Sequence, residues 1–105
     1  MYLIQLHDER ASLQKRIADL TKQVNYEDGP RRQELVEQID RISDTIQWAR
    51  DNDFSSIADR LVLCIQQANR ERHSNRVIVD ALQKELKASK LLLQAINRVI
   101  SKLEQ

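Results

Sequence analysis

Three side chains that can bind metal ions stand together near the start of the chain, at His7, Asp8 and Glu9. Successive residues of a helix point about 100° apart, so these three side chains cannot converge on one ion. The second histidine, His73, lies in a stretch rich in arginine, whose positive charge repels a cation. Because no pair of His or Cys residues has the spacing of a zinc site, we expect no metal site.

The other residue with reactive chemistry is Cys64, the single thiol of the chain. A catalytic thiolate needs a base within hydrogen-bond reach, and His73 lies more than two turns away on a continuous helix. The single glycine excludes a glycine-rich loop that would hold a phosphate group. We therefore predict that the protein is not an enzyme, that it has no cofactor and that Cys64 packs on the apolar side of a helix.

The composition is typical of a helical protein, with 41% hydrophobic and 31% charged residues among 105. This length suits one domain, residues 1–105, and is too short for a multidomain enzyme. One glycine and one proline are too few for an all-β or α/β fold. A single cysteine cannot form an intrachain disulfide, which favours a reducing, cytoplasmic location. The longest apolar runs, such as 61–65, are far shorter than the roughly 20 residues that span a membrane, so we expect no membrane segment.

Hydrophobic periodicity predicts three helices, over residues 2–26, 31–51 and 56–104. The first break falls at Gly29-Pro30, and the second at the turn-forming residues 51–56. In each helix, apolar residues recur at intervals of three and four and form one stripe. The stripe of the last helix is Ala58, Leu61, Ile65, Ala68, Arg72, Asn75, Val79, Leu82, Leu86, Ser89, Leu93, Ile96, Ile100 and Leu103. The predicted fold class is all-α, an antiparallel helical bundle of a helical hairpin plus one long C-terminal helix.

A fully polar stretch, residues 69–76, lies within the long helix, and there the stripe carries only Arg72 and Asn75. The heptad phase is retained across this stretch, which contains neither glycine nor proline, so we expect a continuous helix. A turn near Ser74 would instead give an up-down-up-down four-helix bundle. Because Arg72 and Asn75 are costly if buried without partners, we expect them to set the register between chains or to mark an exposed bend.

The apolar face of the last helix is wider than a two-stranded coiled coil needs, because the residue before many stripe positions is also apolar. We therefore expect the hairpin of the first two helices to pack against the C-terminal half of the long helix. The N-terminal half would protrude and would need a partner helix or a second copy in a homodimer. The expected partner-binding residues are Ile57, Leu61, Cys64, Ile65, Arg72, Asn75, Leu91 and Leu92.

Charge is divided unevenly along the chain. Residues 1–65 hold 9 basic and 12 acidic side chains, net −3, and residues 66–105 hold 8 basic and 4 acidic ones, net +4. This difference favours packing of the acidic helices on the basic one, although each exposed pair contributes at most about 1 kcal/mol. Arg70, Arg72, Arg76 and Lys84 offer an alternative function, association with nucleic acid. Interleaved carboxylates and the lack of aromatic residues in this half disfavour that alternative.

Two asparagines in the long helix, Asn69 and Asn75, are followed by the aliphatic residues Val77, Ile78 and Val79. This pattern resembles the last helix of the flagellar export chaperones for hook-associated proteins, over the C-terminal part of the chain only. In that family the two asparagines are three residues apart, whereas here they are six apart, and a glycine of the family is replaced by an arginine. The resemblance implies an all-helical cytoplasmic chaperone that holds an amphipathic segment of an export substrate.

The sequence as a whole predicts a non-enzymatic protein–protein interaction module. Its mechanism would be the binding of an amphipathic partner helix in an apolar groove, as in an export or assembly chaperone. A coiled-coil protein associated with nucleic acid and a homodimeric structural scaffold are the two alternatives. No membrane partner is expected.

Overall fold

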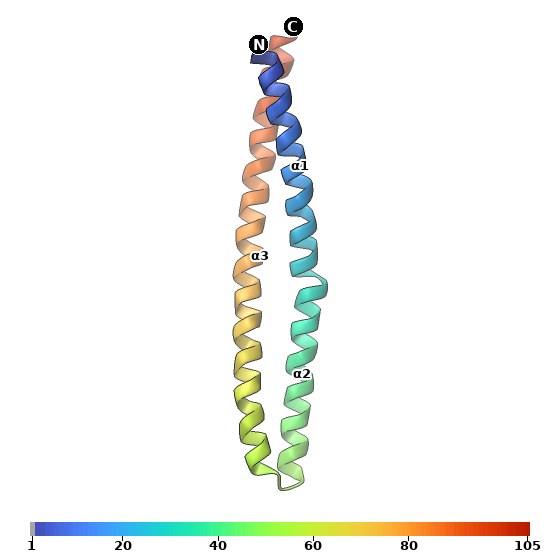
Figure 1. The fold of residues 1–105 in the computed structure, drawn as a ribbon, viewed down its shortest axis with the longest axis vertical. Coiled ribbons are helices and arrows are strands. Elements are labelled where there is room, and N and C mark those ends of the chain that lie inside the picture. The colour runs from blue at the N-terminus through green and yellow to red at the C-terminus, as the bar shows by residue number, and fades with distance from the viewer. Residues whose placement is uncertain (1) are drawn as a thin grey trace. The chain divides into compact units, whose positions relative to one another are not determined.

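The computed structural model describes residues 2–105, which form three α-helices. Helix α1 spans Tyr2–Asp28, α2 spans Pro30–Asp51 and α3 spans Ser55–Leu103 (Figure 1). No strand occurs in residues 2–105, and the prediction of an all-α fold is confirmed. Each helix begins and ends within two residues of the boundary that hydrophobic periodicity predicts.

Helix α3 continues without interruption through the polar stretch 69–76. This stretch contains neither glycine nor proline, so its backbone amides can all bond to the carbonyl four residues earlier. The continuous long helix is therefore confirmed. The alternative, a turn near Ser74 that would create a fourth helix, is excluded.

The chain divides into two compact units that share α3. We call residues 2–25 and 80–105 the terminal unit. In it, α1 runs antiparallel to the C-terminal part of α3, and the two ends of the chain lie side by side (Figure 1). The buried residues of the terminal unit are Leu20, Ser89, Ile96 and Ile100.

The central unit consists of residues 26–79, and in it α2 runs antiparallel to the N-terminal part of α3. Ile46 and Ala49 of α2 pack with Ala58 of α3 in a buried cluster. The half-buried residues around this cluster are Ile42, Leu61, Val62 and Ile65. The expected hairpin of the first two helices on the C-terminal half of α3 is therefore wrong. Helix α2 covers the N-terminal half of α3, which does not protrude.

Burial along α3 follows the predicted stripe, in which most side chains are buried or half-buried. Arg72 and Leu103 are the two exceptions. The long side chain of Arg72 lets its charged end reach water from a position on the stripe. Leu103 is the last residue of α3 and projects beyond the packed part of the helix pair. The heptad pattern therefore identifies the inner face of α3 almost completely.

The turn between α2 and α3 is a Schellman motif centred on Asp53. The amide of Phe54 donates a hydrogen bond to the carbonyl of Ala49 at 2.8 Å, and the amide of Asp53 donates one to the carbonyl of Arg50 at 3.3 Å. Asp53 has a φ angle of 61°, a conformation that glycine adopts at lower cost. This turn brings α3 directly back along α2.

The break between α1 and α2 is a single residue, Gly29. Its φ of −105° is negative, so the positive φ that glycine permits is not used here. Pro30 occupies the first turn of α2, where a missing amide hydrogen costs no helical hydrogen bond. The amide of Gln33 donates to the carbonyl of Gly29 at 3.0 Å, which starts the hydrogen bonding of α2.

Candidate protein interface

Two of the predicted partner-binding residues, Leu61 and Ile65, lie on the inner face of α3. Both are half-buried against the cluster of Ile46 and Ala49 from α2. The expectation that they lie on a protruding, uncovered surface is therefore wrong, and their part in binding a partner stays a prediction. The reason is that α2, which was expected to pack elsewhere, covers them.

A third predicted residue, Asn75, is also used within the chain. It is 6% exposed, and its Nδ2 atom donates hydrogen bonds to the main-chain oxygen and to Oε2 of Glu27, both at 2.9 Å. Because a buried amide without such partners is costly, these two bonds favour one register of the helix pair. Asn75 therefore sets the register within the central unit. The expectation that it marks an exposed bend is wrong, because Asn75 is buried in a continuous helix, whereas a role between chains stays a prediction.

The other predicted residues are exposed, but the structure does not gather them into one site. Ile57, Cys64 and Arg72 lie in the central unit. Leu91 and Leu92 lie in the terminal unit, where they are 57% and 54% exposed. Of these five residues, Leu92 is the one that borders a large groove.

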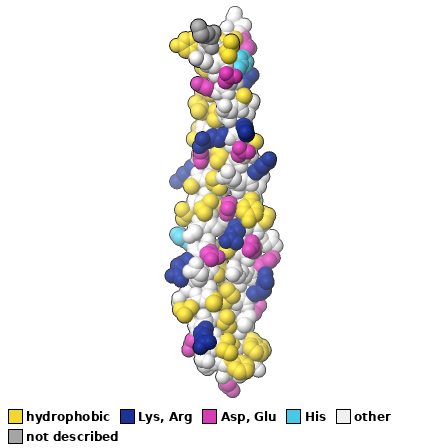
Figure 2. Space-filling model, in the orientation of Figure 1, with side chains coloured by type: hydrophobic (Ala, Val, Ile, Leu, Met, Phe, Trp, Pro, Cys, Tyr) yellow, Lys and Arg dark blue, Asp and Glu magenta, His cyan; other side chains and the backbone are white. Residues whose placement is uncertain are grey.

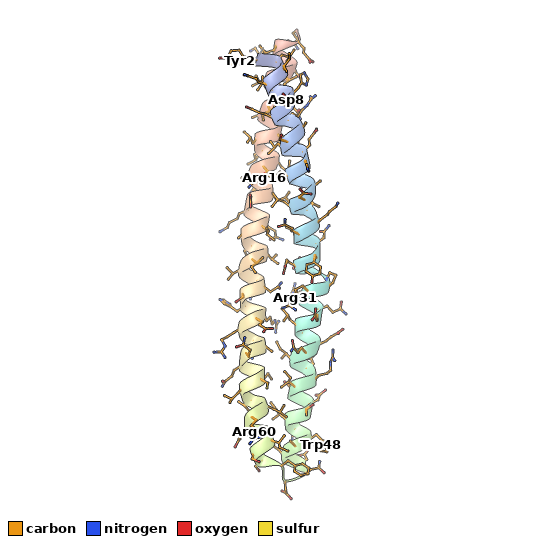
Figure 3. All side chains as sticks on the ribbon, in the orientation of Figure 1. Tyr2, Asp8, Arg16, Arg31, Trp48 and Arg60 are labelled. Carbon is orange, nitrogen blue, oxygen red and sulfur yellow. The ribbon has the colours of Figure 1, made fainter. Side chains whose placement is uncertain are left out.

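This groove lies within the terminal unit, between α1 and α3, and has a volume of about 840 Å³. Its apolar lining is Leu13, Leu20, Leu82, Leu92 and Ile96. Among the polar lining residues, Asp8 and Arg16 mark the α1 side in Figure 3. In Figure 2, hydrophobic side chains lie among charged ones over the visible surface. The groove therefore has an apolar floor and charged sides.

Three alanines spaced seven residues apart lie on the outer side of α3, next to the groove. These are Ala81, Ala88 and Ala95, which we call the alanine flank. Ala88 precedes Leu92 by four residues and Ala95 follows it by three, so both lie on the same side of the helix as Leu92. All three alanines are exposed. Their small side chains would let another helix approach the backbone of α3 closely.

The α1 side of the groove is mainly acidic. Its lining includes the carboxylates of Asp8, Glu9 and Asp19. It also includes two basic residues, and one of them, Arg16, forms an ion pair with Glu85 of α3. Once this pair is set aside, acidic residues outnumber basic ones on this side.

The outer side of α3 is basic instead. The charged residues that border the alanine flank on its outer side are Lys84, Arg98 and Lys102, all exposed. Each lies three, four or seven residues from an alanine of the flank, which places it on or next to the same side of the helix. The groove itself is lined from α3 by one charged residue, Glu85, which pairs with Arg16. The α1 side of the groove is therefore acidic, and the outer side of α3 beyond the alanine flank is basic.

Polar contacts join the helices near the chain ends as well. Nη2 of Arg10 lies 2.8 Å from Nδ1 of His7, and Nε2 of His7 lies 3.3 Å from Oε1 of Glu104. A guanidinium group can only donate, so Nδ1 accepts and the ring proton is on Nε2, facing the carboxylate. His7 therefore links α1 to α3 and acts as a structural residue.

A second exposed apolar patch lies in the central unit, at the α2–α3 turn. The rings of Trp48 and Phe54 stack with their centroids 5.6 Å apart, and both are about half exposed. Trp48 lies at this turn in Figure 3. The stacked rings shield the turn, in which Phe54 also bonds to the main chain.

The basic residues proposed for nucleic acid do not share one side of α3. Arg72 and Arg76 are four residues apart and lie on one side. Arg70 lines a polar pocket that it shares with Glu27, Arg31 and Glu71, so charges of both signs lie there. No observation therefore favours a nucleic-acid site here.

Sequence reasoning missed the groove and the acidic α1 side. The signal that could have revealed the groove was the set of alanines spaced by seven residues beside the stripe, which is typical of a second packing face.

Comparison of the chain with protein-family models, curated proteins and solved structures finds no match. The resemblance to flagellar export chaperones therefore stays a prediction. Among residues 2–105, no helix is both long and apolar enough to cross a membrane.

Proposed function

We propose that this protein is a non-enzymatic, cytoplasmic interaction module that holds a helix of another polypeptide in the groove of the terminal unit. Helix α3 is the scaffold, because it pairs with α1 through its inner face and presents Leu92 and the alanine flank beside it. An amphipathic helix would bury these apolar groups, as in other helix-in-groove complexes. Its polar side would remain in water.

The observation that carries this proposal is the exposure of Leu92 in a groove whose floor is already apolar. Leu92 is 54% exposed, and residues 13, 20, 82 and 96 beneath it are leucine or isoleucine. Single exposed leucines are common on proteins, but a leucine that continues an apolar groove gains a packing partner when a helix binds. The export-chaperone role would be one instance of this function, in which the bound helix belongs to an export substrate.

Affinity capture from the native cells tests the proposal, with the tagged wild-type chain as bait beside two variants. Leu92→Glu places a charge in the groove, whereas Leu63→Glu places the same charge on α3 in the central unit, where Leu63 is 65% exposed. We expect a bound chain that Leu92→Glu loses and Leu63→Glu retains. Equal capture by the two variants would contradict the proposal. Circular dichroism controls for the helix content of both.

A further inference from the structure

We infer that the helix held in this groove comes from a second copy of the chain, so that two terminal units pair face to face in a homodimer. This inference rests on the proposed function and names the partner. It depends on three features of the terminal unit, which are its open apolar groove, the alanine flank and the opposite charge of the α1 side of the groove and the outer side of α3.

Exposed apolar side chains of the terminal unit would form the centre of a helix-packing interface. Leu91, Leu92 and Val99 are each about half exposed, and they lie beside the alanine flank on the outer side of α3. Alanine spaced by seven residues allows two helices to come close, while the larger residues on either side fill the space between them. A second copy presents the same surface and would bury it in return.

Charge complementarity favours a second copy over an unrelated helix. In a two-fold pairing of the grooves, α1 of each copy lies on α3 of the other. The acidic side, with Asp8, Glu9 and Asp19, then faces the basic side of the partner. The residues of that basic side are Lys84, Arg98 and Lys102. Complementary charges on both halves of an interface disfavour wrong partners.

This match holds for either direction of the partner helix. Asp8 and Glu9 lie at the end of the groove next to the His7–Glu104 contact, and Asp19 lies near the Arg16–Glu85 pair at the other end. Basic residues of α3 also occur at both ends, with Lys84 next to Glu85 and Lys102 next to Glu104. Each end of the acidic side therefore meets a basic residue of the partner's α3 in both two-fold arrangements.

The first experiment is sedimentation equilibrium of the full chain with reductant present, since the exposed Cys64 can form intermolecular disulfides. We expect the wild type to dimerise reversibly. Leu92→Glu should weaken self-association by about a hundredfold or more, because it buries a charge at the centre of the interface. The matched control, Leu63→Glu, should dimerise like the wild type. Equal dimerisation of Leu92→Glu and wild type would overturn the inference.

The second experiment reverses the charges. One variant replaces Asp8, Glu9 and Asp19 by Lys, and the other replaces the basic residues of the α3 side by Glu. Each variant alone carries like charges on the α1 side of the groove and the outer side of α3, so we expect each to be monomeric at concentrations where the wild type dimerises. Mixed in equal amounts, they should form a one-to-one heterodimer, because α1 of each then faces the opposite charge on α3 of the other.

Two results would overturn the homodimer. A mixture that contains only monomers would exclude the proposed charge pairing. A wild-type chain that stays monomeric up to about 1 mM would exclude self-association altogether. The proposed function fails separately, through equal capture by the Leu92→Glu and Leu63→Glu baits. A monomeric wild type whose captured partner is lost with Leu92→Glu would leave the proposed function intact and assign the groove to a different protein.

Discussion

The two units share one helix with one continuous stripe, yet the side of α3 next to that stripe differs between them. At equivalent positions, seven residues apart, the central unit has Arg60, Gln67 and Ser74. The terminal unit has Ala81, Ala88 and Ala95. The line is polar in the central unit and apolar in the terminal unit, although the central unit also exposes apolar residues three or four positions away, among them Leu63 and Ile78. Another helix could therefore approach the backbone of α3 more closely along the alanines than along the polar line.

The units also differ in how their helices are connected. In the central unit, α2 and α3 are joined by the short turn at 52–54, so little loop entropy is lost when they pair. In the terminal unit, α1 and the C-terminal part of α3 are separated in sequence by the whole central unit. We expect the central unit to be the more stable of the two and to pair first, because local contacts form at the lowest entropic cost. A second copy would then add stability where the single chain has least.

The largest expected effect comes from the best-buried large side chain of the central unit. Leu35 is fully buried, at 0% exposure, so Leu35→Ala should lower the free energy of unfolding by about 2–5 kcal/mol. Urea denaturation measures this loss. The matched variant in the terminal unit is Leu20→Ala, because Leu20 is also buried.

Hydrogen exchange tests which of the two units is the more stable. If the central unit is the more stable one, Leu20→Ala should speed exchange mainly in residues 2–25 and 80–105. Leu35→Ala should speed exchange in both units, because α1 and the C-terminal part of α3 are connected in sequence through the central unit. The opposite pattern would show that the terminal unit is the more stable of the two.

A smaller loss of stability is expected at Asn75, the buried polar residue of α3 in the central unit. Asn75→Ala removes both hydrogen bonds to Glu27 and leaves that residue's carbonyl without its side-chain donor. We expect the free energy of unfolding to fall by about 1–3 kcal/mol. Asn75→Asp should cost more, because it places a carboxylate against that of Glu27. If Asn75→Ala unfolds at the same urea concentration as wild type, the bonds do not hold the register.

A gain in stability is expected at the turn of the central unit. Asp53 holds a φ of 61°, which glycine adopts without the steric cost of a side chain. Asp53→Gly should therefore raise the free energy of unfolding by up to about 1 kcal/mol, since the gain in the folded state exceeds the added entropy of the unfolded chain. Asp53→Ala is the control and should give no such gain. Thermal and urea unfolding of both variants would show the difference.

The smallest effect is expected at the ion pair of the terminal unit. Both side chains of Arg16–Glu85 are exposed to water, at 61% and 41%. Arg16→Ala should cost less than about 1 kcal/mol, and the cost should shrink as salt is added. Unfolding measured at low and high salt checks this. A loss that is large and independent of salt would show that Arg16 acts through packing instead.

Helix positions and the inner face of α3 could be predicted from the sequence because both depend on local periodicity. Apolar residues at intervals of three and four identify the buried stripe, and the continuous phase through 69–76 predicts an unbroken helix. Arg72 lies on the same stripe and is nevertheless exposed, because its long side chain can extend from the stripe into water. The pattern predicts on which face of the helix a residue lies, but it does not predict whether a long side chain on that face is buried.

The pairing of the helices could not be predicted in this way. All three stripes have the same period, so α2 could have packed on either half of α3, and we expected the wrong half. The candidate site shifted for the same reason. Leu61 and Ile65 are covered by α2, whereas Leu92 remains exposed beside a groove. The short turn at 52–54 is compatible only with packing of α2 on the N-terminal half of α3.

By itself, the sequence determined that this protein is all-helical, where its helices begin and end, and which face of the long helix is buried. These properties depend on residue type and spacing along a single segment. Only the tertiary structure decided which helix covers which half of α3, that Asn75 bonds to Glu27, and that Leu92 stays exposed beside a groove. The reason is that such contacts join residues distant in sequence, and equal heptad patterns allow several pairings until turn geometry and polar bonds select one.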